Sequence, residues 1–164
     1  MCPVGEQTAL VTGGTDGLGR ALAQELAAPG ARVLLHGRDR AKAEQARDAI
    51  AEVTGCGSVE VLIADLASLA QVASLVDQVK EAADSLQLLI NNAGVGGATR
   101  TESADGHELH FAVNYLSHFL LTRELLPLLE RSAPARIVNV SSIGQAPIDF
   151  DDPMIERGYD PMRA

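Results

Sequence analysis

Short apolar runs alternate along this chain with longer segments in which apolar residues recur at helical spacing. A run of four to seven apolar residues suits a buried strand, whereas recurrence every three or four residues suits one face of a helix. The predicted strands are TALVT at 8–12, RVLLHG at 32–37, VEVLIAD at 59–65, LQLLINNAG at 86–94 and RIVNVSS at 136–142. The predicted helices cover 18–28, 40–53, 68–83 and 105–131.

This alternation predicts the fold class. Apolar strands joined through helices by short links indicate right-handed crossovers and a parallel sheet covered on both faces. We therefore predict an α/β protein with a Rossmann-like, doubly wound sheet. The segment 144–164 loses periodicity and gains Pro, Asp and Gly, so it is predicted to be a long loop.

Composition narrows the class further. A chain of 164 residues that is 46% hydrophobic has room for one domain with a sizeable core. A net charge of -9 disfavours nucleic acid as a partner. Cys2 and Cys56 form no C-x-x-C pair and do not suggest a disulfide-stapled secreted domain. Without a signal peptide or a run of about 18 apolar residues, we expect a cytoplasmic protein with no membrane span.

A glycine-rich turn, TGGTDGLG at 12–19, lies between the first predicted strand and the first predicted helix. Such a turn lets backbone N–H groups approach a phosphate, and the helix N-terminus adds a partial positive charge. The pattern therefore predicts a pyrophosphate site. The alternative is that a tight strand-to-helix turn needs glycine for steric reasons alone. An ATP-type P-loop is disfavoured because no Lys-Ser or Lys-Thr follows the glycines.

The spacing T-G-x-x-x-G-x-G resembles the short-chain dehydrogenase/reductase family. Further matches follow in order: Asp65 after the third strand, NNAG at 91–94, Asn114 in the long helix and NVSS at 139–142. A Rossmann methyltransferase, the competing interpretation, does not account for NNAG. The resemblance implies strand order 3-2-1-4-5, an incomplete NAD(P)-binding domain over 1–143, and C-terminal strands that are absent.

The resemblance also implies a set of cofactor-binding residues. The pyrophosphate would lie on the glycine turn, the adenine beside the third strand's end, and the ribose and nicotinamide along NNAG, where Asn91 would be structural. These residues are Gly13, Thr15, Asp16, Gly17, Leu18, Gly19, Asp65, Leu66, Asn92, Ala93 and Gly94.

Cofactor choice is predicted from charge at the end of the second strand. An NAD site carries an acidic side chain there that binds the ribose 2'-OH, whereas binding a 2'-phosphate requires a cation. Here Gly37 stands at the acidic position and Arg38 follows it. We therefore expect NADP rather than NAD, with Arg38 binding the phosphate and Arg40 assisting. Two points oppose the NADP assignment. Arg38 could instead be a solvated residue at the start of a helix, and Asp16 would repel a phosphate.

The family's catalytic set is only partly present. By resemblance, Ser142 would hold the reacting oxygen and Asn114 would hold a relay water. The alternatives are that Ser142 only caps the end of its strand and that Asn114 is a buried structural amide. The family's Tyr-x-x-x-Lys pair is absent. Tyr159 and Arg163 imitate its spacing, but Pro161 between them disfavours a helix. No metal site is predicted, since His107 and His110 lack a third ligand.

The last segment resembles a subgroup related to retinol dehydrogenases, through FDDP at 150–153 and YDP at 159–161. That resemblance predicts 144–164 as the loop before a missing catalytic helix, with the catalytic tyrosine immediately after Ala164. Two functions follow as hypotheses. One is an NADP-dependent oxidoreductase acting on an apolar alcohol or carbonyl substrate, and the other is a truncated, non-catalytic fragment that binds a dinucleotide or dimerises. In either case we expect a homo-oligomer, or association with a missing C-terminal part.

Overall fold

The computed structural model describes residues 3–55, 58–142 and 146–161. Its strands and helices alternate in the predicted order. The strands are β1 (Thr8–Val11), β2 (Arg32–Gly37), β3 (Val59–Ile63), β4 (Leu88–Asn91) and β5 (Arg136–Asn139). The helices are η1 (Val4–Glu6), α1 (Gly17–Ala27), α2 (Arg40–Thr54), α3 (Leu69–Ala82), η2 (Phe111–Leu116) and α4 (Ser117–Arg131).

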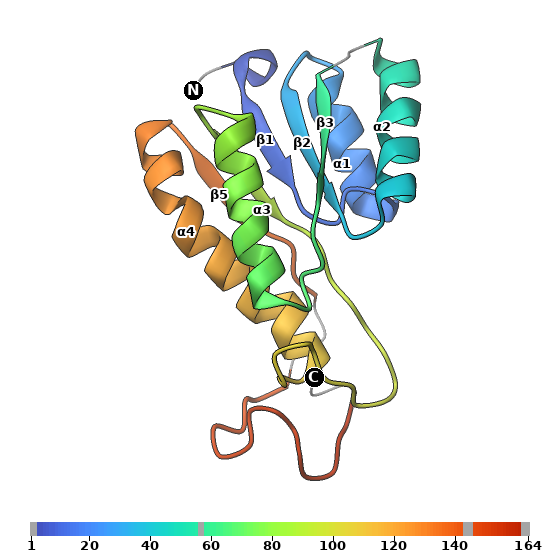
Figure 1. Ribbon diagram of the computed structural model, residues 1–164, viewed down its shortest axis with the longest axis vertical. Helices are drawn as coiled ribbons and strands as arrows, with labels where there is room; N and C mark the ends of the chain where they lie inside the picture. Colours follow the sequence, from blue (N-terminus) through green and yellow to red (C-terminus); the bar gives the residue numbers. More distant parts are fainter. Residues whose placement is uncertain (1–2, 56–57, 143–145, 162–164) are drawn as a thin grey trace.

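The five strands form one parallel sheet in the order β3-β2-β1-β4-β5. Helices α1 and α2 cover one face, and α3 and α4 cover the other (Figure 1). Both the predicted fold class and the predicted strand order are confirmed. The order reverses between β1 and β4, and this is the point at which open α/β sheets bind their ligands.

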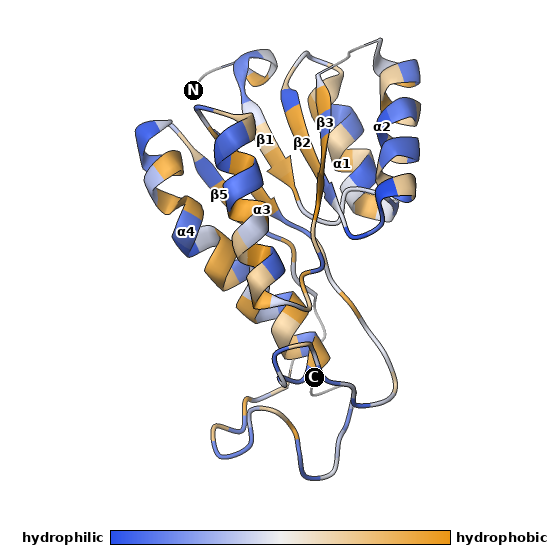
Figure 2. Cartoon of the chain, in the orientation of Figure 1, coloured by the Kyte–Doolittle hydropathy of each residue, from blue (hydrophilic) through white to orange (hydrophobic). Residues whose placement is uncertain are grey.

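The two faces of the sheet have separate cores because successive side chains of a strand point to opposite sides. Leu10, Leu34 and Leu89 pack with α3 and α4. Their strand neighbours Val11 and Ile90 pack with α1 and α2. Figure 2 shows the resulting apolar strands between helices with polar outer faces.

The predicted helix over 105–131 begins later than expected. Gly106 has a positive φ of 78°, and Glu102 pairs with Glu108 in an antiparallel bridge, so this part of the chain turns before the helix can start. The first turns then form the π-helix η2 before the regular helix α4. Four of the predicted strands also end early, because their last residues leave the sheet to form the loops at its carboxyl edge.

Residues 146–161 contain no helix or strand and pack beside the start of the long helix (Figure 1). Ile155 is buried with φ 48°, an unusual backbone conformation for a β-branched residue. The guanidinium Nε of Arg100 donates to the Met154 carbonyl at 3.2 Å. At one edge of the sheet lies β5, whose residues are all exposed.

Candidate functional site

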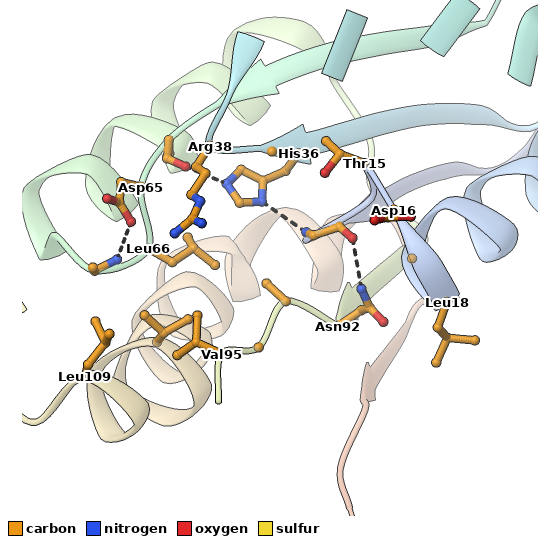
Figure 3. A pocket seen from close by; sticks show the side chains of 18 residues that line it. Thr15, Asp16, Leu18, His36, Arg38, Asp65, Leu66, Asn92, Val95 and Leu109 are labelled. Carbon is orange, nitrogen blue, oxygen red and sulfur yellow. Dashed lines mark hydrogen bonds between the residues drawn. The ribbon is translucent and has the colours of Figure 1, made fainter. Parts of the chain in front are cut away.

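A cavity of about 490 Å³ opens where the carboxyl ends of β1 to β4 meet (Figure 3). Its walls are the glycine turn, the loops after β2, β3 and β4, and two side chains from the start of the long helix. The lining residues are Gly13, Thr15, Asp16, Leu18, Gly19, His36, Gly37, Arg38, Ala64, Asp65, Leu66, Ala67, Asn92, Ala93, Gly94, Val95, Leu109 and Val113. Every predicted cofactor residue except Gly17 and the assisting Arg40 is among them.

The glycine turn is held against β2 by two hydrogen bonds. The Gly13 N–H donates to Nδ1 of His36 at 3.3 Å, and the Gly14 N–H donates to the His36 carbonyl at 2.9 Å. A Cβ on Gly13 would lie 2.8 Å from Cα of Ala93, so the turn also packs tightly on the end of β4. The absence of a side chain at Gly13 is therefore a packing requirement of this fold.

His36 links the turn to β3 as well. Because Nδ1 accepts from Gly13, the neutral ring carries its proton on Nε2, which donates to the Ala64 carbonyl at 3.1 Å. The ring is only 3% exposed, and burial lowers its pKa from 6.5 to about 4. His36 is therefore a neutral bridge between three parts of the cavity wall.

The end of β4 is tied to the turn through Thr12 and Asn92. The Thr12 hydroxyl accepts from the N–H groups of Asn92 at 2.9 Å and Ala93 at 3.0 Å. The Asn92 amide donates to the carbonyls of Thr12 at 2.9 Å and Gly13 at 3.2 Å. Asn92 thus lines the cavity while its donor group holds the turn in place.

Helix α1 points its N-terminus at the cavity. Asp16 caps the helix by accepting the Gly17 N–H at 2.7 Å, and Gly17 itself has φ 50° with open space around it. The first N–H groups of a helix have no intrahelical partner, and the helix dipole makes this end attractive to anions. The Asp16 carboxylate opposes that attraction.

Two further charged groups lie on the β2 and β3 sides of the cavity. Arg38 is exposed on its rim, whereas Arg40 is engaged with Glu44 at 3.6 Å. The Asp65 carboxylate accepts the Ala67 N–H at 2.9 Å and so shapes the loop after β3. The cation on this wall that faces the cavity is therefore Arg38, while Arg40 is not among the lining residues.

Asn114 lies in η2 and does not line the cavity. Its side chain forms two hydrogen bonds with the backbone of Val95, accepting from the N–H at 2.8 Å and donating to the carbonyl at 3.0 Å. It therefore fixes the loop that follows β4, and Val95 in this loop does line the cavity.

The other predicted polar residues lie around β4 and β5. Asn91 is fully buried and donates to Thr122 at 3.0 Å and Asn139 at 2.8 Å, which joins β4 to α4 and β5. Burial lowers the pKa of His118 on α4. Ser142 follows β5 at the same sheet edge as the loop after β4, because the two strands are parallel and paired up to Asn139. Ser142 is not among the cavity-lining residues.

Tyr159 is placed away from the cavity. Its hydroxyl lies 3.3 Å from Oε1 of Glu108 and 3.3 Å from Nδ1 of His110, and both of these side chains are buried. Burial and the nearby Glu108 carboxylate raise the pKa of Tyr159, which is the opposite of what a catalytic base needs. The predicted partner in the imitation motif, Arg163, lies outside the described residues.

Sequence reasoning missed several residues of this site. Leu109, Val113 and Val95 are apolar, and nothing in their spacing distinguishes a cavity wall from a core. Thr12 was seen only as the first letter of the glycine motif. His36 had a detectable signal, since it is a polar residue inside a strand that is otherwise apolar.

The family described as short chain dehydrogenase matches residues 7–148 of this chain. Retinol dehydrogenase 14 of Mus musculus is 44% identical over 165 residues, which cover 93% of this chain and 49% of the relative. Polyprenol dehydrogenase of Homo sapiens is 40% identical over 168 residues, covering 99% of this chain and 51% of the relative. The chain thus spans about half the length of these curated relatives.

A solved structure, the Pseudomonas aeruginosa RhlG/NADP active-site complex, is 35% identical with a TM-score of 0.74, and the match covers 88% of this chain and 59% of that one.

In the parts of the chain that the structure describes, no helix combines the length and apolar character needed to cross a membrane.

Proposed function

The chain belongs to the short chain dehydrogenase family, among relatives that include retinol dehydrogenases, and from that premise we propose that it binds NADP for hydride transfer to or from an alcohol or carbonyl substrate. The observation that carries the proposal is the cavity at the reversal of the strand order. It is lined by every predicted cofactor residue except Gly17 and the assisting Arg40.

The residues of this cavity fit a dinucleotide. The N-terminus of α1 and the glycine turn supply backbone N–H groups for a pyrophosphate. Glycines at 13, 14, 17 and 19 leave much of the turn's backbone without side chains. Asp65 and Leu66 would border the adenine, and Asn92, Ala93 and Gly94 the ribose and nicotinamide. A bound nicotinamide would supply the hydride donor or acceptor.

The preference for NADP rests on Arg38 and Gly37. Arg38 is a cation on the cavity rim, and Gly37 offers no carboxylate to a ribose 2'-OH. A relative solved with NADP supports the same choice.

The test compares the Kd values of NADP and NAD for the wild-type chain and for Arg38→Ala. We expect the substitution to weaken NADP binding at least tenfold and to leave NAD binding nearly unchanged. The matched control is Arg40→Ala, which lies outside the cavity lining and should change the ratio little. An unchanged ratio in Arg38→Ala would overturn the assignment.

On the substrate side, we propose that Ser142 holds the reacting oxygen and that Asn114 contributes to a proton relay, with the acid/base Tyr and its Lys outside this chain. The names of the relatives, retinol dehydrogenase and polyprenol dehydrogenase, favour an apolar alcohol as the substrate class. A cytoplasmic location stays a prediction from composition.

The second candidate is a non-catalytic dinucleotide-binding fragment that associates with itself or with a separate C-terminal part. The outer edge of β5 favours it, because β5 pairs with β4 on one side and ends the sheet on the other, and an edge strand with exposed Ile137 and Val138 is prone to further pairing. Sedimentation of the chain at micromolar concentration tests the association. A stable monomer that also binds NADP would count against self-association.

A further inference from the structure

Thr15 fills the space beside Gly37, the last residue of β2. A Cβ added to Gly37 would come nearer than 3.0 Å to Cγ2 of Thr15, a separation that real Cβ atoms essentially never show, and 3.5 Å from Cβ of Ala43. Gly37 is buried and has no positive φ, so space rather than backbone conformation excludes a side chain there. Thr15 and Gly37 both line the cavity, and Figure 3 shows Thr15 in its wall.

Thr15 has little freedom to move aside. A β-branched side chain is restricted at χ1, so its methyl group cannot swing away freely. The backbone just before it is fixed as well, because Gly13 and Gly14 both donate hydrogen bonds to His36 on β2. The turn therefore holds the Thr15 methyl against the end of β2.

We propose that the Thr15 methyl is a determinant of cofactor choice, because it excludes the acidic side chain that an NAD site carries at position 37. The inference rests on the proposed dinucleotide function, in which such a carboxylate would bind the ribose 2'-OH. With position 37 limited to glycine, the charge that remains on this wall is the Arg38 cation, which suits a 2'-phosphate. Whether this wall can carry an acidic side chain thus depends on a pair of positions, 15 and 37, rather than on position 37 alone.

The steric part is tested without any cofactor by a double-mutant cycle on thermal unfolding. Gly37→Ala should lower Tm by several degrees. Thr15→Ser, which removes the methyl and keeps the hydroxyl, should recover most of that loss when combined with Gly37→Ala. Thr15→Val, which keeps a methyl and loses the hydroxyl, should recover none of it. Additive effects in the serine cycle would overturn the proposal.

The selectivity part is tested by Kd values for NADP and NAD. Gly37→Asp alone should weaken both by at least tenfold. Adding Thr15→Ser should restore NAD binding and shift the NADP-to-NAD ratio at least tenfold toward NAD relative to wild type, whereas adding Thr15→Val should not. A switch to NAD by Gly37→Asp alone would overturn the proposal. If the wild type bound neither dinucleotide, the proposed function would fail, while the unfolding cycle would still decide the steric claim.

Discussion

The imidazole of His36 and the backbone amide of Gly13 are joined by a hydrogen bond of 3.3 Å, and the same ring reaches the Ala64 carbonyl at 3.1 Å. One buried side chain of β2 thus holds the first glycine of the turn and the residue that follows β3. Since all three segments line the cavity, its shape depends on this ring.

Substitutions of His36 should therefore separate its two contacts. Asn reproduces an acceptor near the Nδ1 position, whereas Gln reaches the Nε2 position and its contact with Ala64. We expect His36→Asn to keep more of the NADP affinity than His36→Gln, because it keeps the bond to Gly13. Either variant should cost about 1 to 3 kcal/mol of unfolding free energy, since a buried partner is left unsatisfied. Calorimetric titration and denaturant unfolding measure the two quantities, and equal NADP affinities would contradict the assigned role.

The pKa of His36 also makes stability depend on pH. The folded chain keeps the ring neutral down to about pH 4, whereas the unfolded chain takes up a proton near 6.5. The stabilisation is therefore fully present above pH 6.5 and is lost as the pH falls toward 4, by up to about 3 kcal/mol. The unfolding free energy of His36→Asn should fall less than that of the wild type over this range. His118 shifts in the same direction and remains in both proteins, so the difference between the two curves reports His36 together with its interaction with His118. Parallel curves would contradict the account.

The fold and much of the cavity could be predicted from local patterns. Alternating apolar strands and helices identified the parallel sheet, and glycine spacing together with NNAG identified segments that converge at one edge. These signals are local, so each can be recognised within about ten residues. The convergence follows because parallel strands all place their carboxyl ends at the same edge.

The remaining features depend on contacts between distant residues. Gly13 and His36 are 23 positions apart, and Tyr159 lies 51 positions from Glu108. No periodic pattern of residues in the sequence indicates such contacts. The late start of the long helix has a local cause instead, because the Glu102–Glu108 bridge replaces the helical hydrogen bonds that the composition of that segment favours.

The two glycines at the start of α1 should respond differently to alanine. A Cβ on Gly19 would clash with the Gly13 carbonyl, and it would also crowd the Asn92 amide, whereas a Cβ on Gly17 meets nothing within 4 Å. We expect Gly19→Ala to destabilise the chain by about 2 kcal/mol or more. Gly17→Ala should cost about 1 kcal/mol through its positive φ alone. Urea unfolding of the two variants is the measurement, and a larger loss for Gly17→Ala would contradict the packing described.

The contact of Tyr159 with Glu108 should hold the loop 146–161 in place. Tyr159→Phe removes the hydroxyl that contacts the buried Glu108 carboxylate and should lower the unfolding free energy by about 1 kcal/mol. Limited proteolysis should then cut this loop faster in the variant than in the wild type. Tyr115→Phe is a suitable control, because Tyr115 is exposed and its ring stacks on those of Phe111 and Phe119. Equal cleavage rates in Tyr159→Phe and wild type would contradict a docked loop.

Hydrogen–deuterium exchange with and without NADP tests the central claim most directly, because it reports where the dinucleotide binds. We predict slower exchange in peptides covering 12–19, 36–38, 64–67 and 92–95, and little change in α2 or in the loop 146–161. Protection confined to other segments, or none at a saturating NADP concentration, would contradict the account.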